Sequence, residues 1–258
     1  MPKTPEQIAL DKQRDRLTKR FHKACADYRL IADGDHILIG LSGGKDSLLL
    51  TELLGRRARI HVPSFKVSAL HVRVKERDYH TDLSYLEAFC AEAGVPLLVR
   101  DVEIGEVPES KIENRKSKTE NPCFLCSWYR RKTLFNVAQE IGCNKIAFGH
   151  HRDDIAETLL MNLIYQGTFA TMPPMLQLDK MPLQLIRPLC LIDEADIIRY
   201  AEMRGYEKQT KLCPFEHVSS REKVKELLSQ IKALNPEAID SMYGALTNIK
   251  TEYLPKLI

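Results

Sequence analysis

The stretch Ser42-Gly43-Gly44-Lys45-Asp46-Ser47 decides the fold, because it joins a buried strand to a helix. The apolar run HILIGL at 36–41 precedes it, and the helical sequence SLLLTELLGRRA at 47–58 follows it. Two glycines let the backbone approach an anion closely, and the start of a helix directs N–H groups and a partial positive charge at it. Two glycines alone would more often mark a simple turn. The serines and the lysine add donors, so we expect phosphate binding by Ser42, Gly43, Gly44, Lys45, Asp46 and Ser47.

Strands and helices alternate along the chain after this loop. This alternation is typical of βαβ units, whose loops after each strand meet at one edge of a parallel sheet, where ligands bind. It predicts an α/β fold with a doubly wound, mostly parallel five-stranded sheet, an N-terminal helix and a C-terminal helical extension. We expect the five strands at 36–41, 66–72, 96–102, 145–149 and 183–189, and helices at 5–31, 47–58, 79–93, 127–141 and 153–167.

The pattern divides the chain into three segments. Residues 1–31 form a basic helical segment, and residues 32–192 form the phosphate-loop α/β domain, which carries a CxxC stretch in an insertion. Residues 193–258 form a helical C-terminal region with a further cysteine at 213.

Composition narrows the class of protein. The 258 residues are 44% hydrophobic, enough for a sizeable core, and 38 Lys and Arg against 35 Asp and Glu leave a net charge of only +3. No apolar run reaches the roughly 18 residues of a membrane span, and the first residues lack the apolar centre of a signal peptide. Seven cysteines without an export signal favour reduced thiols, some of them used for metal or redox chemistry. We expect a cytoplasmic enzyme with no membrane partner.

Acidic residues near the loop predict a magnesium site. Asp46 lies inside the phosphate loop, and a carboxylate beside phosphates is repulsive unless a cation intervenes. A second polar stretch, Gly149-His150-His151-Arg152-Asp153-Asp154, follows the fourth strand and starts a helix. Helix capping explains one of its aspartates and neither histidine. The string GHHRDD is similar to the GHxxDD element of the ATP pyrophosphatases that thiolate tRNA. This resemblance implies that Gly149 and His150 contact ATP, that Asp154 acts as a metal ligand or general base, and that Asp153 is a second magnesium ligand beside Asp46.

Three cysteines are candidates for a metal or redox site. Cys123 and Cys126 form a CxxC at the start of a helix, a position that lowers the pKa of a thiol, and Cys213 interrupts helical sequence. The CxxC does not follow a strand as in thioredoxins, and no second CxxC completes a zinc ribbon. Cys213 and His217 could complete a Cys₃His zinc site, which remains an alternative to iron–sulfur use. We expect Cys25, Cys90, Cys143 and Cys190 to lie in the core.

The CxxC is flanked by a basic stretch with interleaved aromatic residues. Residues 109–132 carry seven Lys and Arg against three Asp and Glu, and the first helix is also basic. Most charge runs are solvated faces, but aromatic stacking combined with phosphate contacts is how a single-stranded base is held. We expect RNA contacts from Lys111, Lys116, Lys118, Trp128, Tyr129 and Arg131.

These motifs together resemble a known family. The loop SGGKDS is similar to the pyrophosphate loop (PP-loop) of the N-type ATP pyrophosphatases and lacks Walker A spacing. With CFLCSWYRR, GHHRDDIAETLLMNLIYQG, MPP at 172–174, IRPL at 186–189 and Cys213, the chain resembles the tRNA 2-thiocytidine synthetase (tRNA-cytidine 2-sulfurtransferase) family over about Leu17 to Ile249.

The resemblance implies an activity. ATP would adenylate the C2 oxygen of a cytidine, expected at tRNA position 32, and sulfide from a [4Fe–4S] cluster held by Cys123, Cys126 and Cys213 would replace that oxygen. Lys45 and Asp46 would be catalytic with Asp154, and Arg130 would lie near the ATP and the target base. His71 and Val72 would contact adenine through the backbone. ATP and Mg²⁺ would be cofactors, tRNA and a sulfide donor such as a cysteine desulfurase would be partners, and a homodimer is a candidate assembly.

One departure keeps alternatives open. The family's downstream element is usually PCxxC, and here it is LCPFEH, with His217 one place after the position of the missing second cysteine. Cytidine and uridine present the same C2 oxygen, so a 2-thiouridine synthetase is one alternative. A zinc-stabilised RNA-binding protein with a regulatory nucleotide loop is the other.

Overall fold

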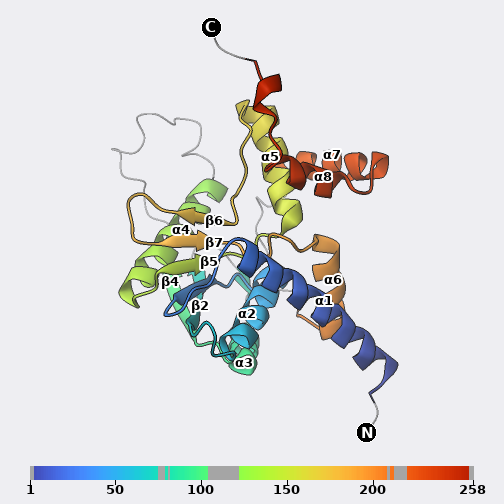
Figure 1. Cartoon of the computed structure of the whole chain (residues 1–258). Coiled ribbons are helices and arrows are strands. Elements are labelled where there is room, and N and C mark those ends of the chain that lie inside the picture. Colours follow the sequence, from blue (N-terminus) through green and yellow to red (C-terminus); the bar gives the residue numbers. More distant parts are fainter. Residues whose placement is uncertain are drawn as a thin grey trace. The chain divides into compact units, whose positions relative to one another are not determined.

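The computed structural model describes residues 3–74, 79–80, 82–103, 122–207, 210–211 and 220–255 (Figure 1). The chain forms two units. The first comprises Met1–His151 and Pro174–His217, and the second comprises Arg152–Pro173 and Val218–Ile258. The division expected from the sequence, after residues 31 and 192, stays a prediction.

A mostly parallel sheet forms the centre of the first unit. Its order is β4-β2-β1-β5-β7-β6, and every neighbouring pair is parallel except β6 and β7. The doubly wound sheet is confirmed, with six strands in the described residues rather than five. The additional strand is a three-residue edge strand that no apolar run marks. The strands are β1 (His36–Gly40), β2 (Lys66–Val74), β4 (Leu97–Val102), β5 (Lys145–Ala147), β6 (Met175–Gln177) and β7 (Gln184–Ile186).

Helices cover both faces of this sheet. Ile37 and Ile39 of β1 point into a core shared with one group of helices, whereas Leu38 points into a core with α4, because successive side chains alternate across a strand. The group on the first face is α1 (Pro5–Asp27), α2 (Lys45–Ala58), α3 (Leu83–Ala93) and α6 (Glu194–Arg204), and α4 spans Pro122–Glu140. A separate antiparallel pair joins β3 (Tyr79–His80) to β8 (Thr210–Lys211).

Local sequence explains where these helices begin. Thr4 caps α1 in a reciprocal capping box with Gln7. The helix that we expected to start at residue 79 starts at Leu83 instead, because the Asp82 side chain accepts the N–H of Tyr85 and caps it there. The N-cap of α2 is Gly44, which has no side chain with which to cap the helix.

The strand order defines where a ligand binds. β1 lies between β2 and β5, and the connections after β1 and before β5 cover opposite faces of the sheet. This is a topological switch point, and ligands of such sheets bind beyond the carboxyl ends of the strands there. The Ser42–Ser47 loop follows β1 and residues 149–151 follow β5, so both motifs meet at this position.

The second unit is helical. It contains α5 (Arg152–Gln166), α7 (Ser220–Leu234), α8 (Ala238–Ala245) and a short 3₁₀ helix at Thr251–Tyr253. Ala156, Leu228 and Ile239 form its small core, with Leu160 and Met242 packed against them. No helix in the described part of the chain is long and apolar enough to cross a membrane.

Candidate functional site

The loop after β1 has the geometry of an anion-binding turn. Gly43 has a φ of +82°, which favours glycine. The Ser42 and Ser47 hydroxyls form a hydrogen bond of 3.1 Å, and Ser47 Oγ donates to the Gly44 carbonyl at 2.9 Å. These hydrogen bonds of the two serines stabilise the turn. Because the N-cap residue Gly44 has no side chain to accept them, the N–H groups of the first turn of α2 can serve an anion.

Lys45 lies between two carboxylates. Its Nζ atom is 3.2 Å from Asp46 Oδ2 and 3.0 Å from Glu194 Oε1, the latter in the first turn of α6. Burial lowers the pKa of Lys45, but Asp46 and Glu194 outweigh it, so the pKa is raised and the ammonium stays charged. We did not predict Glu194 from the sequence. Its position just after the IRPL strand, at the carboxyl end of β7, is the signal that could have found it.

The segment after β5 packs directly against this loop. A Cβ atom built on Gly149 would lie 3.0 Å from the carbonyl carbon and oxygen of Asp46, so any other residue here requires a shift of the loop backbone. His151 is buried, with Nε2 3.9 Å from Asp46 Oδ1 and 3.8 Å from Glu194 Oε1. His150 is partly buried and its ring lies 5.6 Å from that of Phe148. The structure therefore brings Gly149 and His151 of the second motif against the phosphate loop at one edge of the sheet.

Asp46 fits a divalent cation. Its Oδ1 atom is buried and accepts no hydrogen bond from the part of the chain that the structure describes. A buried carboxylate oxygen is costly without a partner, and Mg²⁺ prefers oxygen ligands. Among the described residues, no group of three His, Cys, Asp or Glu side chains is placed to hold a metal ion.

The carboxylates at the start of α5 face cations of α7, within the second unit. Asp153 is buried with Lys232 Nζ at 2.5 Å. Arg221 donates to Asp154 at 2.8 Å and to Glu157, which is also buried, at 2.9 Å. These cations lie 64 to 79 positions later in the chain than the carboxylates they meet, which is why sequence spacing did not indicate them. The shared metal role of Asp46 and Asp153 stays a prediction.

His71 supports the start of the phosphate loop. Its Nδ1–H donates to the Leu41 carbonyl at 2.8 Å, so the buried ring fixes the residue that precedes the loop. Burial lowers the pKa of His71, the hydrogen bond to Leu41 opposes this, and the nearby Arg130 guanidinium lowers it further. The Arg130 guanidinium on α4 is therefore near enough to His71 of β2 to act on its charge. Val72 is a buried core residue, and adenine contact by this segment stays a prediction.

The structure describes part of the cysteine set. Cys126 is a buried free thiol on α4. The side chain of Cys123, in the first turn of α4, and both Cys213 and His217 lie outside the described residues. The expected core positions are confirmed: Cys25 is partly buried, and Cys90, Cys143 and Cys190 are buried. Burial raises the pKa of Cys25 to about 12 and the pKa values of Cys90 and Cys143 to about 11.

Some expected RNA contacts lie on α4. The Trp128 and Tyr129 rings meet edge to face at 4.9 Å, and Lys132 Nζ lies 5.1 Å from the Trp128 ring centre. Arg131 is exposed and donates to the Ser127 carbonyl at 3.1 Å. Lys111, Lys116 and Lys118 lie outside the described residues.

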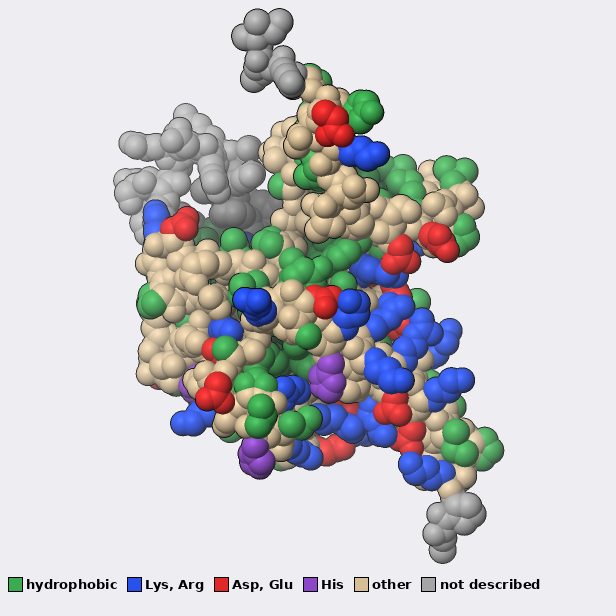
Figure 2. Space-filling model, in the orientation of Figure 1, with side chains coloured by type: hydrophobic (Ala, Val, Ile, Leu, Met, Phe, Trp, Pro, Cys, Tyr) green, Lys and Arg blue, Asp and Glu red, His purple; other side chains and the backbone are tan. Residues whose placement is uncertain are grey.

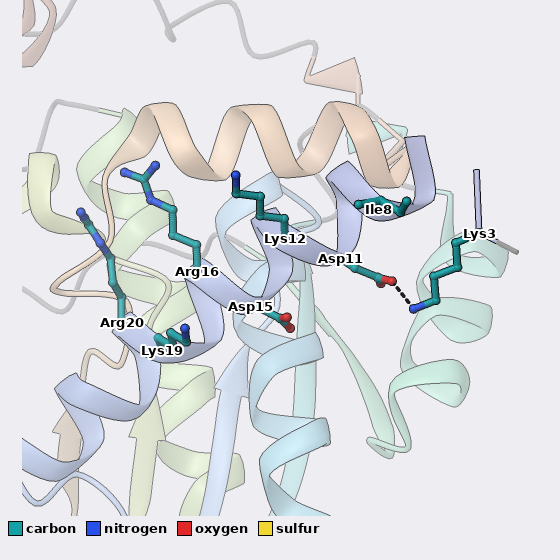
Figure 3. A pocket seen from close by; sticks show the side chains of 8 residues that line it. All are labelled: Lys3, Ile8, Asp11, Lys12, Asp15, Arg16, Lys19 and Arg20. Carbon is teal, nitrogen blue, oxygen red and sulfur yellow. Dashed lines mark hydrogen bonds and ion pairs between the residues drawn. The ribbon is translucent and has the colours of Figure 1, made fainter. Parts of the chain in front are cut away.

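The basic face of α1 is a second RNA candidate. Figure 2 shows basic side chains gathered over the region of α1 and α6. Lys12, Arg16 and Arg20 extend to the same side of α1 (Figure 3). Asp196 and Asp193 pair with Arg16 and Arg20 at 3.0 and 2.6 Å, so much of this charge is already compensated. A groove along the helix is lined by Lys3, Ile8, Asp11, Lys12, Asp15, Arg16, Lys19 and Arg20.

The fold and this loop define the class of protein as a PP-loop ATP-binding domain. The PP-loop domain family matches residues 13–209, about three quarters of the chain. A U34-tRNA thiolase, NcsA from Methanococcus maripaludis, solved with its [4Fe–4S] cluster, has the same fold. It superposes with a TM-score of 0.74 at 24% identity, over 96% of this chain and 84% of that one.

Curated relatives narrow the class. A tRNA-cytidine(32) 2-sulfurtransferase of Chromohalobacter salexigens is 35% identical over 96% of this chain and 86% of its own length. Those of Vibrio cholerae and Alcanivorax borkumensis are 34% identical, over 96% and 97% of this chain and 79% and 87% of their own. The chain belongs to the tRNA-cytidine(32) 2-sulfurtransferase family, a family of PP-loop sulfurtransferase enzymes.

Proposed function

We propose that this protein uses ATP to replace the C2 oxygen of cytidine 32 in tRNA by sulfur. The observation that carries the proposal is the 35% identity to a curated enzyme of this name over 96% of the chain. The phosphate loop, with Lys45 charged and Asp46 poised for a cation, supplies the chemistry that such an enzyme needs.

Two displacements would accomplish the exchange. The C2 oxygen attacks the α-phosphorus of ATP, a P–O bond to pyrophosphate breaks, and the base carries an adenylate at C2. A sulfide then attacks C2, and the C–O bond breaks to release AMP. Adenylation turns a poor oxygen leaving group into a good one, which is why a pyrophosphate loop is combined with a sulfur source.

Residues of the loop have distinct roles in the first displacement. N–H groups of the first turn of α2 bind the β- and γ-phosphates, and Lys45 places its charge where negative charge develops on departing pyrophosphate. Asp46 would hold Mg²⁺, which supplies further charge neutralisation. Asp154 remains our candidate for a further metal ligand or general base, with Asp153 as a second magnesium ligand, and Arg130 would lie near the reacting base.

Cysteines would provide the sulfur site. Cys123, Cys126 and Cys213 offer three thiolates, a donor set suited to a [4Fe–4S] cluster with one iron left open, and the cluster would supply sulfide to the base. A Cys₃His zinc site with His217 is the alternative. We expect Cys213→Ala to lose iron and thiolation and Cys90→Ala, in the core, to keep both. Iron retained in Cys213→Ala would assign the third position to another ligand.

A loop base must be unstacked before C2 can be attacked, and aromatic residues beside cations hold such bases. We assign this role to Trp128, Tyr129 and Arg131, with Lys111, Lys116 and Lys118 on neighbouring phosphates. Binding should then weaken steeply with salt.

The test is reconstitution with a defined substrate. Enzyme loaded with iron and sulfide is incubated anaerobically with ATP, Mg²⁺, sulfide and unmodified tRNA, and the tRNA is digested to nucleosides. We expect 2-thiocytidine, its absence with tRNA carrying uridine at position 32, and no thionucleoside with Asp46→Ala. Appearance of 2-thiouridine, or of no thionucleoside from wild-type enzyme that consumes ATP, would overturn the proposed substrate.

A further inference from the structure

Glu194 lies in the phosphate site without a role in the chemistry above. Its Oε1 atom is 3.0 Å from Lys45 Nζ and 3.8 Å from His151 Nε2. A glutamate in the first turn of a helix is favoured by the helix dipole alone, which explains the residue type. The dipole does not explain why the side chain reaches the one lysine of the phosphate loop, 149 positions earlier in the chain.

The helix that carries Glu194 is fixed relative to α2. Tyr200 of α6 is buried and donates to Glu52 of α2 at 2.7 Å, and Tyr206, just after α6, donates to the same carboxylate at 2.8 Å. On the other side of α6, Gln13 of α1 donates to the backbone carbonyl of Asp196 at 3.1 Å. These contacts, two of them buried, hold the first turn of α6 opposite the first turn of α2, so Glu194 meets Lys45 in a preset geometry.

The charges around Lys45 make this contact consequential. Asp46 and Glu194 together carry two negative charges against the single charge of Lys45. A polyphosphate that enters the loop competes with Glu194 for the ammonium and is repelled by its carboxylate. Glu194 is therefore expected to weaken the binding of ATP before the reaction. The same contact restricts the Lys45 ammonium to one direction.

We propose that Glu194 is a positioning residue for Lys45, holding the ammonium in the direction from which it meets the departing pyrophosphate. The inference rests on the proposed use of ATP at this loop. It requires that loss of the carboxylate improves ATP binding while turnover falls, because the same contact that competes with phosphate also orients Lys45. A residue that only supported the fold would lower affinity and turnover together.

The experiment compares Glu194→Gln with Glu202→Gln, an exposed position on the same helix. Binding of ATP and of pyrophosphate is measured by calorimetry, and AMP formation is measured with tRNA. Because the Lys45–Glu194 pair is about 30% exposed, we expect Glu194→Gln to bind ATP only about two- to fivefold more tightly. We expect its kcat to fall about tenfold because the ammonium is misdirected. Glu202→Gln should match the wild type.

A second background shows whether Glu194 acts through Lys45. In Lys45→Met, the added change Glu194→Gln should no longer alter kcat, since no ammonium remains to be positioned. An unchanged kcat in Glu194→Gln, a joint loss of affinity and turnover, or the same loss of kcat in the Lys45→Met background would overturn the inference. Wild-type enzyme that binds neither ATP nor pyrophosphate would overturn the proposed function, and this inference with it.

Discussion

Replacement of Gly149 by alanine tests how tightly the two motifs at the switch point are packed. The new Cβ atom would lie 3.0 Å from the carbonyl carbon and oxygen of Asp46 and 3.1 Å from the Ser47 nitrogen. Favourable contacts between two carbon atoms begin at about 3.5 Å, so the new Cβ atom and the Asp46 carbonyl carbon must move apart by about 0.5 Å. These three nearest atoms are all backbone, so no side-chain rotation relieves the contacts and the first turn of α2 must move.

The expected magnitudes follow from this overlap. Overpacking by one methyl group costs about 1–3 kcal/mol of unfolding free energy. At about 2–4 °C for each kcal/mol, the melting temperature should fall by about 2–12 °C. The displaced atoms belong to the phosphate loop itself, so we expect ATP affinity to fall about tenfold, beyond what the loss of stability explains.

Calorimetric ATP titration and thermal unfolding measure the two effects separately. Gly244→Ala on α8 is the matched control, because no neighbouring atom of the described residues lies within 4 Å of a Cβ atom placed there. It should leave ATP affinity unchanged and raise stability slightly, as alanine is the better helix former. A Gly149→Ala protein with wild-type melting temperature and ATP affinity would refute the close packing of Gly149 against the loop.

Three further predictions concern other parts of the molecule. Asp35→Asn leaves the buried Lys145 ammonium, 2.7 Å away, without its counter-charge, so urea unfolding should show a loss of about 3 kcal/mol. Adding Lys145→Met to Asp35→Asn should restore part of the lost stability. An Asp35→Asn protein as stable as the wild type would contradict the stabilising role of this buried ion pair. At pH 8, Cys90 and Cys143 should react slowly with iodoacetamide, because burial raises their pKa values and leaves little thiolate. Mass spectrometry measures the labelling, and labelling at the rate of a free thiol would argue against burial. Arg221→Ala removes a partner of two α5 carboxylates and should lower turnover at unchanged ATP affinity, whereas unchanged turnover would exclude a positioning role for this arginine.

The fold could be predicted from the sequence because its signals are local. The apolar run before Ser42, the two glycines and the helix after them lie within 25 residues, and together they specify strand, turn and helix. The predicted start of α3 was wrong by four residues, because the preference of Asp82 for the N-cap position outweighed the apolar periodicity. β6 has three exposed residues, so burial left no pattern in its sequence.

The site could be predicted only where the chain supplies adjacent residues. Lys45 and Asp46 follow from the loop itself, whereas Glu194 reaches Lys45 through the packing of α6 on α2. The pairing of Arg221 with Asp154 likewise depends on how α7 packs against α5. Composition and spacing contain no information on such tertiary contacts.

The helix α2 is enclosed along most of its length. The nine successive residues from Ser47 to Gly55 are all buried, immediately after the turn that meets the phosphates. A helix that is buried in this way cannot tilt or slide to suit its ligand, so the site has little capacity to adapt to an altered nucleotide. Selection for a foldable chain and selection for catalysis therefore act on the same residues. Substitutions deep in this helix, far from any phosphate, are expected to behave in genetic screens as losses of enzyme activity.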